Sequence, residues 1–187
     1  MDRIALTATS PLEGLRLSVG DNRIAEQTGY AVVSIAIPQG GEAALVSTLK
    51  AGWSLDLPDH ALSSVAGDAR AVRTAPDQLL LIFPHDAPDA SRVVQDKLQG
   101  TGYTTDQTDG WVQVTVAGPG TAAALERLSP IDLSPETFPI HAAARTVFEH
   151  MGVLVIRTGE GSFLLLSAAS SAGSFLHAVK TSFDYTA

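Results

Sequence analysis

Short apolar runs bounded by turn residues recur along the chain and limit it to folds rich in buried strands. Residues 30–37 read YAVVSIAI, residues 79–83 read LLLIF and residues 151–156 read MGVLVI. Runs of this length and composition are typical of strands covered on both faces. None approaches the roughly 20 apolar residues that a membrane-spanning helix needs. The sequence therefore predicts buried sheet strands.

Helical segments and further strands lie between and after these runs. Apolar residues at helical spacing predict four helices, at about 41–52, 86–100, 119–128 and 170–182. Turn signals predict hairpins within 69–83, turning at 75–77, and within 102–118, turning at Asp109-Gly110, and three strands at 142–149, 152–158 and 162–168. We expect an α+β fold with mostly antiparallel sheets, helices packed on one side, and two ferredoxin-like βαββα-type units.

The length and local composition suggest how the chain is divided. At 187 residues, a single domain is the default. Residues 1–29 are mixed polar and are interpreted as an N-terminal arm with one short strand, while residues 53–68 are interpreted as a loop. Residues 30–187 are expected to form one α+β domain, which the repeating pattern divides into possible pseudo-repeat halves at about 30–108 and 109–187.

Charge and composition exclude several classes of function. Twelve Lys and Arg residues against twenty Asp and Glu residues give a net charge of −8, and no basic stripe is present to neutralise phosphates. Binding to nucleic acid or to an anionic membrane is therefore not expected. The absence of cysteine excludes disulfides and thiolate chemistry, and no apolar signal-peptide region is recognisable near the N-terminus. We expect a cytoplasmic protein.

Sequence motifs for catalysis or cofactor binding are weak. Residues 116–123, VAGPGTAA, formally match the G-x-G-x-x-A dinucleotide fingerprint, but Pro119 removes one amide at the helix start. We interpret this segment as a strand-to-helix turn and keep nucleotide binding as a third hypothesis. No G-x-S-x-G motif occurs. The histidines are dispersed without metal-ligand spacing, and they are His60, His85, His141, His150 and His177.

A proline-rich connector and a tryptophan are the candidate interface elements. Residues 128–139 read LSPIDLSPETFP, and three prolines in twelve residues exclude a regular helix. A stiff connector can present Ile131, Leu133 and Phe138 to a partner at low entropic cost, or these side chains can cover the chain's own sheet. Both interpretations stay open. Trp111, at the start of a strand, is likewise a candidate interface anchor or a plug of the core.

The same connector carries a family resemblance. Residues 128–166, LSPIDLSPETFPIHAAARTVFEHMGVLVIRTGEGSFLLL, resemble the γ-subunit family of heterotetrameric sarcosine oxidase, whose members commonly have a "CPLDL…F…G…AQT" stretch before paired apolar strands. The residues in matching order are Pro130, Asp132, Leu133, Phe138, Arg145 and Thr146. The segments SPLEGL, VSIAIPQG, APDQLLLIFP and VAGPGTAAAL are also similar to the family in order and spacing. The chain departs from the pattern at Ser129, where cysteine is frequent, and at Leu79, where tryptophan is frequent.

The resemblance implies a non-catalytic γ subunit that acts in assembly and stability. It implies a fold related to the folate-binding aminomethyltransferase, with α, β and δ subunits as partners. It implies that FAD, FMN, NAD and tetrahydrofolate bind to those partners and not to this chain. The complex would demethylate sarcosine oxidatively to glycine, pass the one-carbon unit to tetrahydrofolate and form hydrogen peroxide. The alternative is a stand-alone module that binds folate or pterin in a retained pocket.

Overall fold

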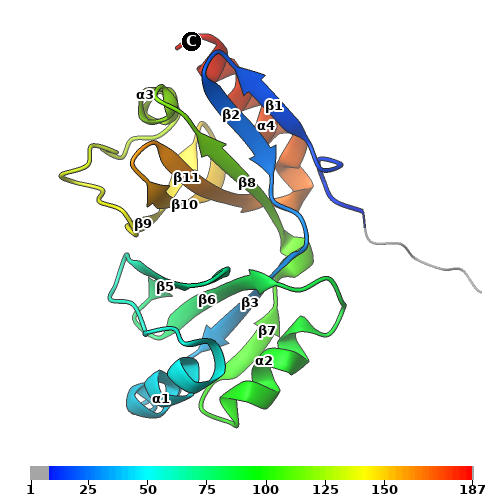
Figure 1. Cartoon of the computed structure of the whole chain (residues 1–187), viewed down its shortest axis with the longest axis vertical. Coiled ribbons are helices and arrows are strands. Elements are labelled where there is room, and N and C mark those ends of the chain that lie inside the picture. The colour runs from blue at the N-terminus through cyan, green and yellow to red at the C-terminus, as the bar shows by residue number, and fades with distance from the viewer. Residues whose placement is uncertain (1–8, 187) are drawn as a thin grey trace, which may run out of the picture.

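Two antiparallel sheets stack face to face, and helices cover the outer face of each (Figure 1). The computed structural model describes residues 9–186 of the 187-residue chain. The helices are α1 (Glu42–Trp53), α2 (Ala90–Leu98), α3 (Thr121–Glu126) and α4 (Ala172–Asp184), and the 3₁₀ turns are η1 (Thr108–Gly110) and η2 (Ala169–Ser171). The predicted α+β class, with helices on one side of each antiparallel sheet, is confirmed.

The first sheet has six strands in the order β1-β2-β8-β11-β10-β9. These strands are β1 (Arg16–Val19), β2 (Asn22–Glu26), β8 (Trp111–Ala117), β9 (Ala143–Phe148), β10 (Met151–Gly159) and β11 (Ser162–Ala168). The second sheet has five strands in the order β4-β5-β6-β3-β7. They are β3 (Tyr30–Ala36), β4 (Ser63–Ala66), β5 (Ala69–Ala75), β6 (Gln78–Pro84) and β7 (Tyr103–Asp106).

Three apolar clusters hold these layers together, as the continuous apolar strands require. One joins α3 and α4 to the six-stranded sheet and a second joins α1 and α2 to the five-stranded sheet. The third lies between the sheets, where Val32, Ile82, Ile156 and Leu166 are at most 1% exposed. The strand 79–83 is buried along its length and lies between β5 and β3, as predicted for a central strand.

The two halves of the chain have the same order of elements and equivalent strand pairing. The orders β3-α1-β4-β5-β6-α2 and β8-α3-β9-β10-β11-α4 are equivalent. Each half also contributes one strand to the sheet of the other half. The strand β2, which precedes β3, pairs with β8, and the strand β7, which precedes β8, pairs with β3. Two segments connect the sheets, residues 27–29 between β2 and β3 and residues 107–110 between β7 and β8, and we call them the crossovers. They make equivalent hydrogen bonds: Gln27 N–H donates to Gln113 O (2.9 Å), and Gln107 N–H donates to Val32 O (2.8 Å).

Four local expectations were wrong. Residues 102–118 do not form a hairpin: η1 carries the chain from one sheet to the other, so β7 and β8 pair with different partners. The expected arm at 1–29 contains two strands instead of one, and its residues 1–8 lie outside the described part. The expected loop at 53–68 contains β4, and the helix expected at 119–128 spans only Thr121–Glu126.

Candidate functional site

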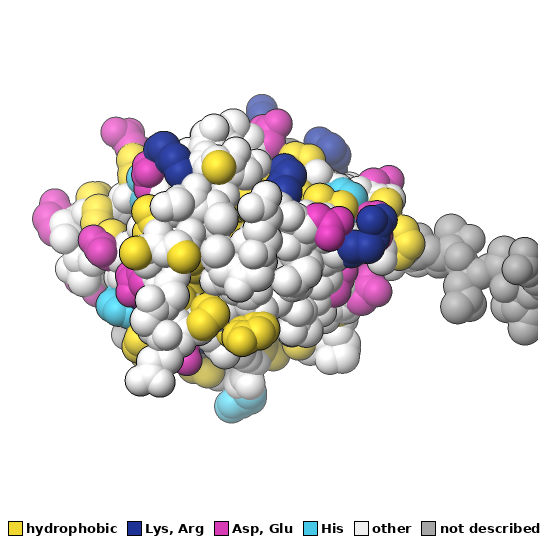
Figure 2. Space-filling view, turned by 90° about the horizontal axis from the view of Figure 1, so that it is seen from below, with side chains coloured by type: hydrophobic (Ala, Val, Ile, Leu, Met, Phe, Trp, Pro, Cys, Tyr) yellow, Lys and Arg dark blue, Asp and Glu magenta, His cyan; other side chains and the backbone are white. Residues whose placement is uncertain are grey.

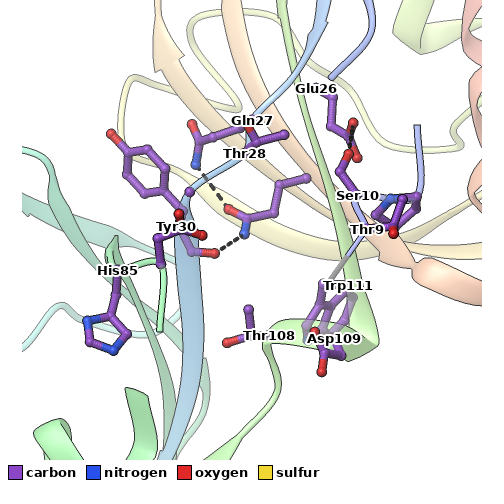
Figure 3. A pocket seen from close by; sticks show the side chains of 14 residues that line it. Thr9, Ser10, Glu26, Gln27, Thr28, Tyr30, His85, Thr108, Asp109 and Trp111 are labelled. Carbon is purple, nitrogen blue, oxygen red and sulfur yellow. Dashed lines mark hydrogen bonds between the residues drawn. The ribbon is translucent and has the colours of Figure 1, made fainter. Parts of the chain in front are cut away.

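A cavity of about 470 Å³ opens where the two crossovers pass between the sheets (Figure 3). The segment from Glu26 to Tyr30 forms one wall, and the segment around η1 forms another. Figure 3 shows Tyr30 and His85 on one side and Ser10, Asp109 and Trp111 on the other. Because both crossovers line it, this cavity contacts both halves of the fold.

A glutamine pair forms the inner wall of the cavity. Gln113 is 5% exposed, and its Oε1 accepts a 3.0 Å hydrogen bond from Gln27 Nε2. Its own Nε2 donates to the carbonyl oxygen of Tyr30 at 3.1 Å (Figure 3). Next to this pair, the Thr108 hydroxyl accepts from the Val32 amide at 3.1 Å. These bonds fix both crossovers, so the inner wall is preformed.

Glu26 holds the segment that closes the cavity on its N-terminal side. Its carboxylate is 7% exposed and accepts from the Ser10 hydroxyl and from the backbone amides of Leu12 (3.1 Å) and Gly14 (2.7 Å). Three donors on one carboxylate satisfy most of its acceptor capacity. Glu26 therefore has a structural explanation, and few of its lone pairs stay open to a ligand.

Trp111 contributes an aromatic wall. The ring also packs against the inter-sheet core, and Arg145, which does not line the cavity, lies 5.9 Å from the ring centroid. Its indole nitrogen is buried and has no hydrogen-bond partner within residues 9–186. Trp111 thus packs against the inter-sheet core and also lines the cavity at the crossovers.

A histidine–aspartate pair stands at the rim. His85 Nε2 lies 2.7 Å from Asp89 Oδ1, and Arg92 contacts the other carboxylate oxygen. The hydrogen bond from His85 is the main cause that lowers the pKa of Asp89 below its ordinary value of 3.8, and the charge of Arg92 acts in the same direction. This pair holds the imidazole ring in place beside the cavity.

The proline-rich connector is held to the chain's own sheet by a buried arginine. Arg157 of β10 is 3% exposed, and its Nη1 donates to the carbonyl oxygens of Leu133 (2.8 Å) and Phe138 (2.9 Å). Its remaining nitrogens donate to Gly159 (3.3 Å) and Glu160 (2.5 Å). No carboxylate within residues 9–186 pairs with it, so backbone carbonyls alone solvate this charge.

The four candidate interface residues fall into two groups. Leu133 is fully buried and Phe138 is 7% exposed, both in the cluster beneath α3 and α4, and Ile131 is partly buried against the same cluster. This placement favours the interpretation that the connector covers the chain's own sheet. Trp111 alone lines a cavity. A role of these residues in a partner interface stays a prediction.

Asp132 stabilises the connector locally. Its Oδ1 accepts from the Ser134 amide at 2.8 Å, and this backbone hydrogen bond is the largest cause that lowers the pKa of Asp132 below 3.8. This contact is an Asx turn, which stiffens the connector between two of its prolines.

The glycine-rich segment before α3 is filled by another part of the chain. Gly120 N–H donates to Asn22 Oδ1 at 2.9 Å, and a Cβ at Gly118 would stand 2.4 Å from the same oxygen. The backbone there approaches the β1–β2 turn closely, which explains the glycine at φ +143°. The amide that a pyrophosphate would need already has a partner, so this geometry favours the strand-to-helix turn.

Three further features bear on function. Among residues 9–186, no group of three or more His, Asp or Glu side chains is placed to hold a metal ion. In the same part of the chain, every helix is too short or too polar to cross a membrane. On the lower side of the molecule, where α1 and α2 lie, hydrophobic side chains are scattered over the surface, and charged side chains of both signs lie around them (Figure 2).

Comparison with known proteins gives matches over most of the chain. The chain is 31% identical to the sarcosine oxidase γ subunit of Corynebacterium sp. (strain P-1) over 139 residues, which cover 72% of this chain and 66% of that relative. It is 30% identical to the γ subunit of Arthrobacter sp. over 135 residues, covering 70% and 64%. The chain belongs to the sarcosine oxidase γ-subunit family. The matched region spans just under two thirds of the length of these curated relatives.

Solved structures agree on the fold. A chain of the heterotetrameric sarcosine oxidase from Corynebacterium sp. U-96, in complex with pyrrole 2-carboxylate, superposes with a TM-score of 0.81 over 96% of both chains at 23% identity. The aminomethyltransferase T of the glycine cleavage system from Bartonella henselae superposes with a TM-score of 0.55 over 82% of this chain and 44% of its own, at 14% identity. No family model matches the chain.

Reasoning from the sequence missed the cavity and the arginine. The cavity depends on crossovers about 80 positions apart, and no local pattern brings Gln27 to Gln113. Arg157 left a signal, because an arginine inside the apolar strand MGVLVIRTG must find buried acceptors.

Proposed function

We propose that the chain is the γ subunit of a cytoplasmic complex of the heterotetrameric sarcosine oxidase type and contributes to its assembly and stability. The observation that carries this proposal is the 31% identity to a γ subunit over 72% of the chain. The superposition over 96% of a chain of such an oxidase supports the same fold. In this proposal α, β and δ subunits are the partners.

The reaction is assigned to those partners. The complex would convert sarcosine to glycine, pass the one-carbon unit to tetrahydrofolate and form hydrogen peroxide, with FAD, FMN, NAD and tetrahydrofolate bound outside this chain. Two observations support a supporting role for the chain itself. The connector, which carries the family-like residues, accepts hydrogen bonds from Arg157 of the same chain. The glycine-rich segment before α3 is hydrogen-bonded to Asn22.

A partly covered sheet edge supports assembly with another chain. β9 is an edge strand of the six-stranded sheet; its first residue, Ala143, already donates to Ala61 O at 2.8 Å, but Val147 further along it is 45% exposed. Ile140, just before β9, is also 45% exposed. An edge strand with exposed apolar side chains pairs readily with another chain unless it is covered.

Affinity purification of the tagged chain from its native cell tests the proposal. Larger chains should co-elute in fixed ratio, with the visible absorption of a flavin, and mass spectrometry should identify them as oxidase subunits. A chain that elutes alone and colourless would refute the proposed function.

The alternative, a folate- or pterin-binding module, requires a carboxylate free to read the pterin ring. Glu26, the most enclosed acid of the cavity, already accepts from three donors, which weighs against it. Titration of the isolated chain with tetrahydrofolate decides this alternative, since it predicts saturable binding.

A further inference from the structure

The cavity at the crossovers has the chemical character of a cation site. Its lining includes the carboxylates of Glu26, Asp86 and Asp109, no lysine or arginine lines it, and the lining histidine, His85, is paired with Asp89 outside the lining. Glu26 is satisfied internally, but Asp86 and Asp109 are exposed and have no hydrogen-bond or ion-pair partner among residues 9–186. Two carboxylates without counter-ions therefore face the same hollow.

The other walls of the cavity also favour a positively charged ligand. Tyr30 and Trp111 line the cavity, and aromatic faces attract ammonium and guanidinium groups. Between them, Gln113 Oε1 and the Thr108 hydroxyl add oxygen acceptors, which are fixed by their bonds to Gln27 and Val32. Acceptors, carboxylates and aromatic rings around one hollow match a group that carries several N–H donors and one positive charge.

We propose that this cavity binds an organic cation of the alkylguanidinium or alkylammonium class. Asp86 and Asp109 supply the charge, the rings of Tyr30 and Trp111 supply the apolar walls, and the glutamine pair orients the N–H donors. The cation is either an arginine or lysine side chain of a partner subunit, which rests on the proposed function, or a free small amine.

Fluorescence titration of the full chain measures binding of the free cation. Trp53→Phe removes the other tryptophan, which packs against the α1–α2 cluster and does not line the cavity, so Trp111 becomes the reporter. Ethylguanidinium chloride is added against sodium chloride at equal ionic strength. In this background the double variant Asp86→Asn/Asp109→Asn should bind about two- to thirtyfold more weakly, the range for two exposed charge pairs.

A matched control separates the cavity from general charge effects. Asp96 lies on α2, is exposed, does not line the cavity, and makes only a 3.9 Å ion pair with Arg92. Asp96→Asn removes the same charge and should leave the titration unchanged. Circular dichroism verifies that each variant is folded.

Assembly with the partner subunits distinguishes the two sources. The wild-type chain and the double variant are co-expressed with the other subunits, and retention of the chain is measured by gel filtration at low and high salt. Weaker retention of the double variant identifies a partner side chain; unchanged retention with a saturable, aspartate-dependent titration identifies a free cation. If the titration is not saturable or does not depend on the aspartates, and retention is also unchanged, the inference is wrong. A chain that assembles with nothing refutes the proposed function, while the titration still decides the cation site.

Discussion

Replacing Arg157 with methionine should destabilise the whole fold, because the side chain solvates the carbonyl oxygens of the connector. Methionine keeps an unbranched side chain against the ring of Phe163, which lies 5.2 Å from the guanidinium carbon, but removes all donors. The carbonyl oxygens of Leu133 and Phe138 accept buried hydrogen bonds at 2.8 and 2.9 Å and would lose them. The acceptors in the turn after β10 are only partly buried and can reach water.

The magnitude follows from the two buried carbonyls. Leaving a buried acceptor without a partner costs about 1–3 kcal/mol, while removing a buried charge recovers part of its desolvation cost. We therefore expect a loss of about 2–4 kcal/mol in the free energy of unfolding. For 187 residues, an unfolding entropy of about 2.1 cal/mol/K per residue converts this loss into a Tm lower by roughly 5–10 °C.

Calorimetry and urea unfolding of the purified chain measure the effect. Arg145→Met is the matched control, because Arg145 is exposed on β9 and its side chain, which lies over the ring of Trp111, makes no hydrogen bond or ion pair within the described residues. The control should lose no more than about 1 kcal/mol, the range of an exposed cation–π contact. Equal losses for the two variants, or a loss below about 1 kcal/mol for Arg157→Met, would refute the reasoning.

Three further perturbations test the connector and the β1–β2 contact. Leu133→Ala should lower the free energy of unfolding in urea by about 2–5 kcal/mol, because the side chain is fully buried. An unchanged urea midpoint together with lost assembly would instead show that Leu133 acts in a partner interface. Asp132→Asn should be destabilising at pH 7, and the difference from wild type in thermal unfolding should shrink as pH falls below 3.8 and through the lowered folded pKa. The sign follows because the bond from Ser134 lowers the folded pKa below 3.8, so the stabilisation is complete above that value and is lost as pH falls through the folded pKa. Gly118→Ala should lower Tm by several degrees, since φ is +143° and its Cβ would meet Asn22 Oδ1 at 2.4 Å; an unchanged Tm would contradict the close approach.

Local patterns predicted most strands and helices because each is set by its own residues. The hairpin of β5 and β6 and the three strands β9, β10 and β11 were found from apolar runs and turn signals. The helix α2 was found from the spacing of Ala90, Val93, Val94 and Leu98; three of these are buried, while Val93 is only partly buried. The class of the fold followed from the order of these elements.

Pairing across the chain was not predictable in the same way. Asp109-Gly110 is a hairpin signal, yet these residues belong to a 3₁₀ turn that carries the chain between sheets. A turn signal specifies that the chain bends, and the partner of each strand is decided by burial on both of its faces. β7 finds β3 and β8 finds β2 and β11, which are distant in sequence. The cavity is a product of these distant pairings and was missed for the same reason.

The exchange of β2 and β7 makes each half of the fold depend on the other. Without β2, the strand β8 would lose the partner that pairs with it from Arg23 to Glu26, and without β7 the same holds for β3. Both crossovers are then fixed at one place by Gln27 and Gln107. A group bound in the cavity beside them touches residues that belong to both sheets, so its binding energy acts on the junction and not on one half alone. That position fits the proposed role in assembly, because a partner bound there would stabilise the paired arrangement of the halves only when both crossovers are formed.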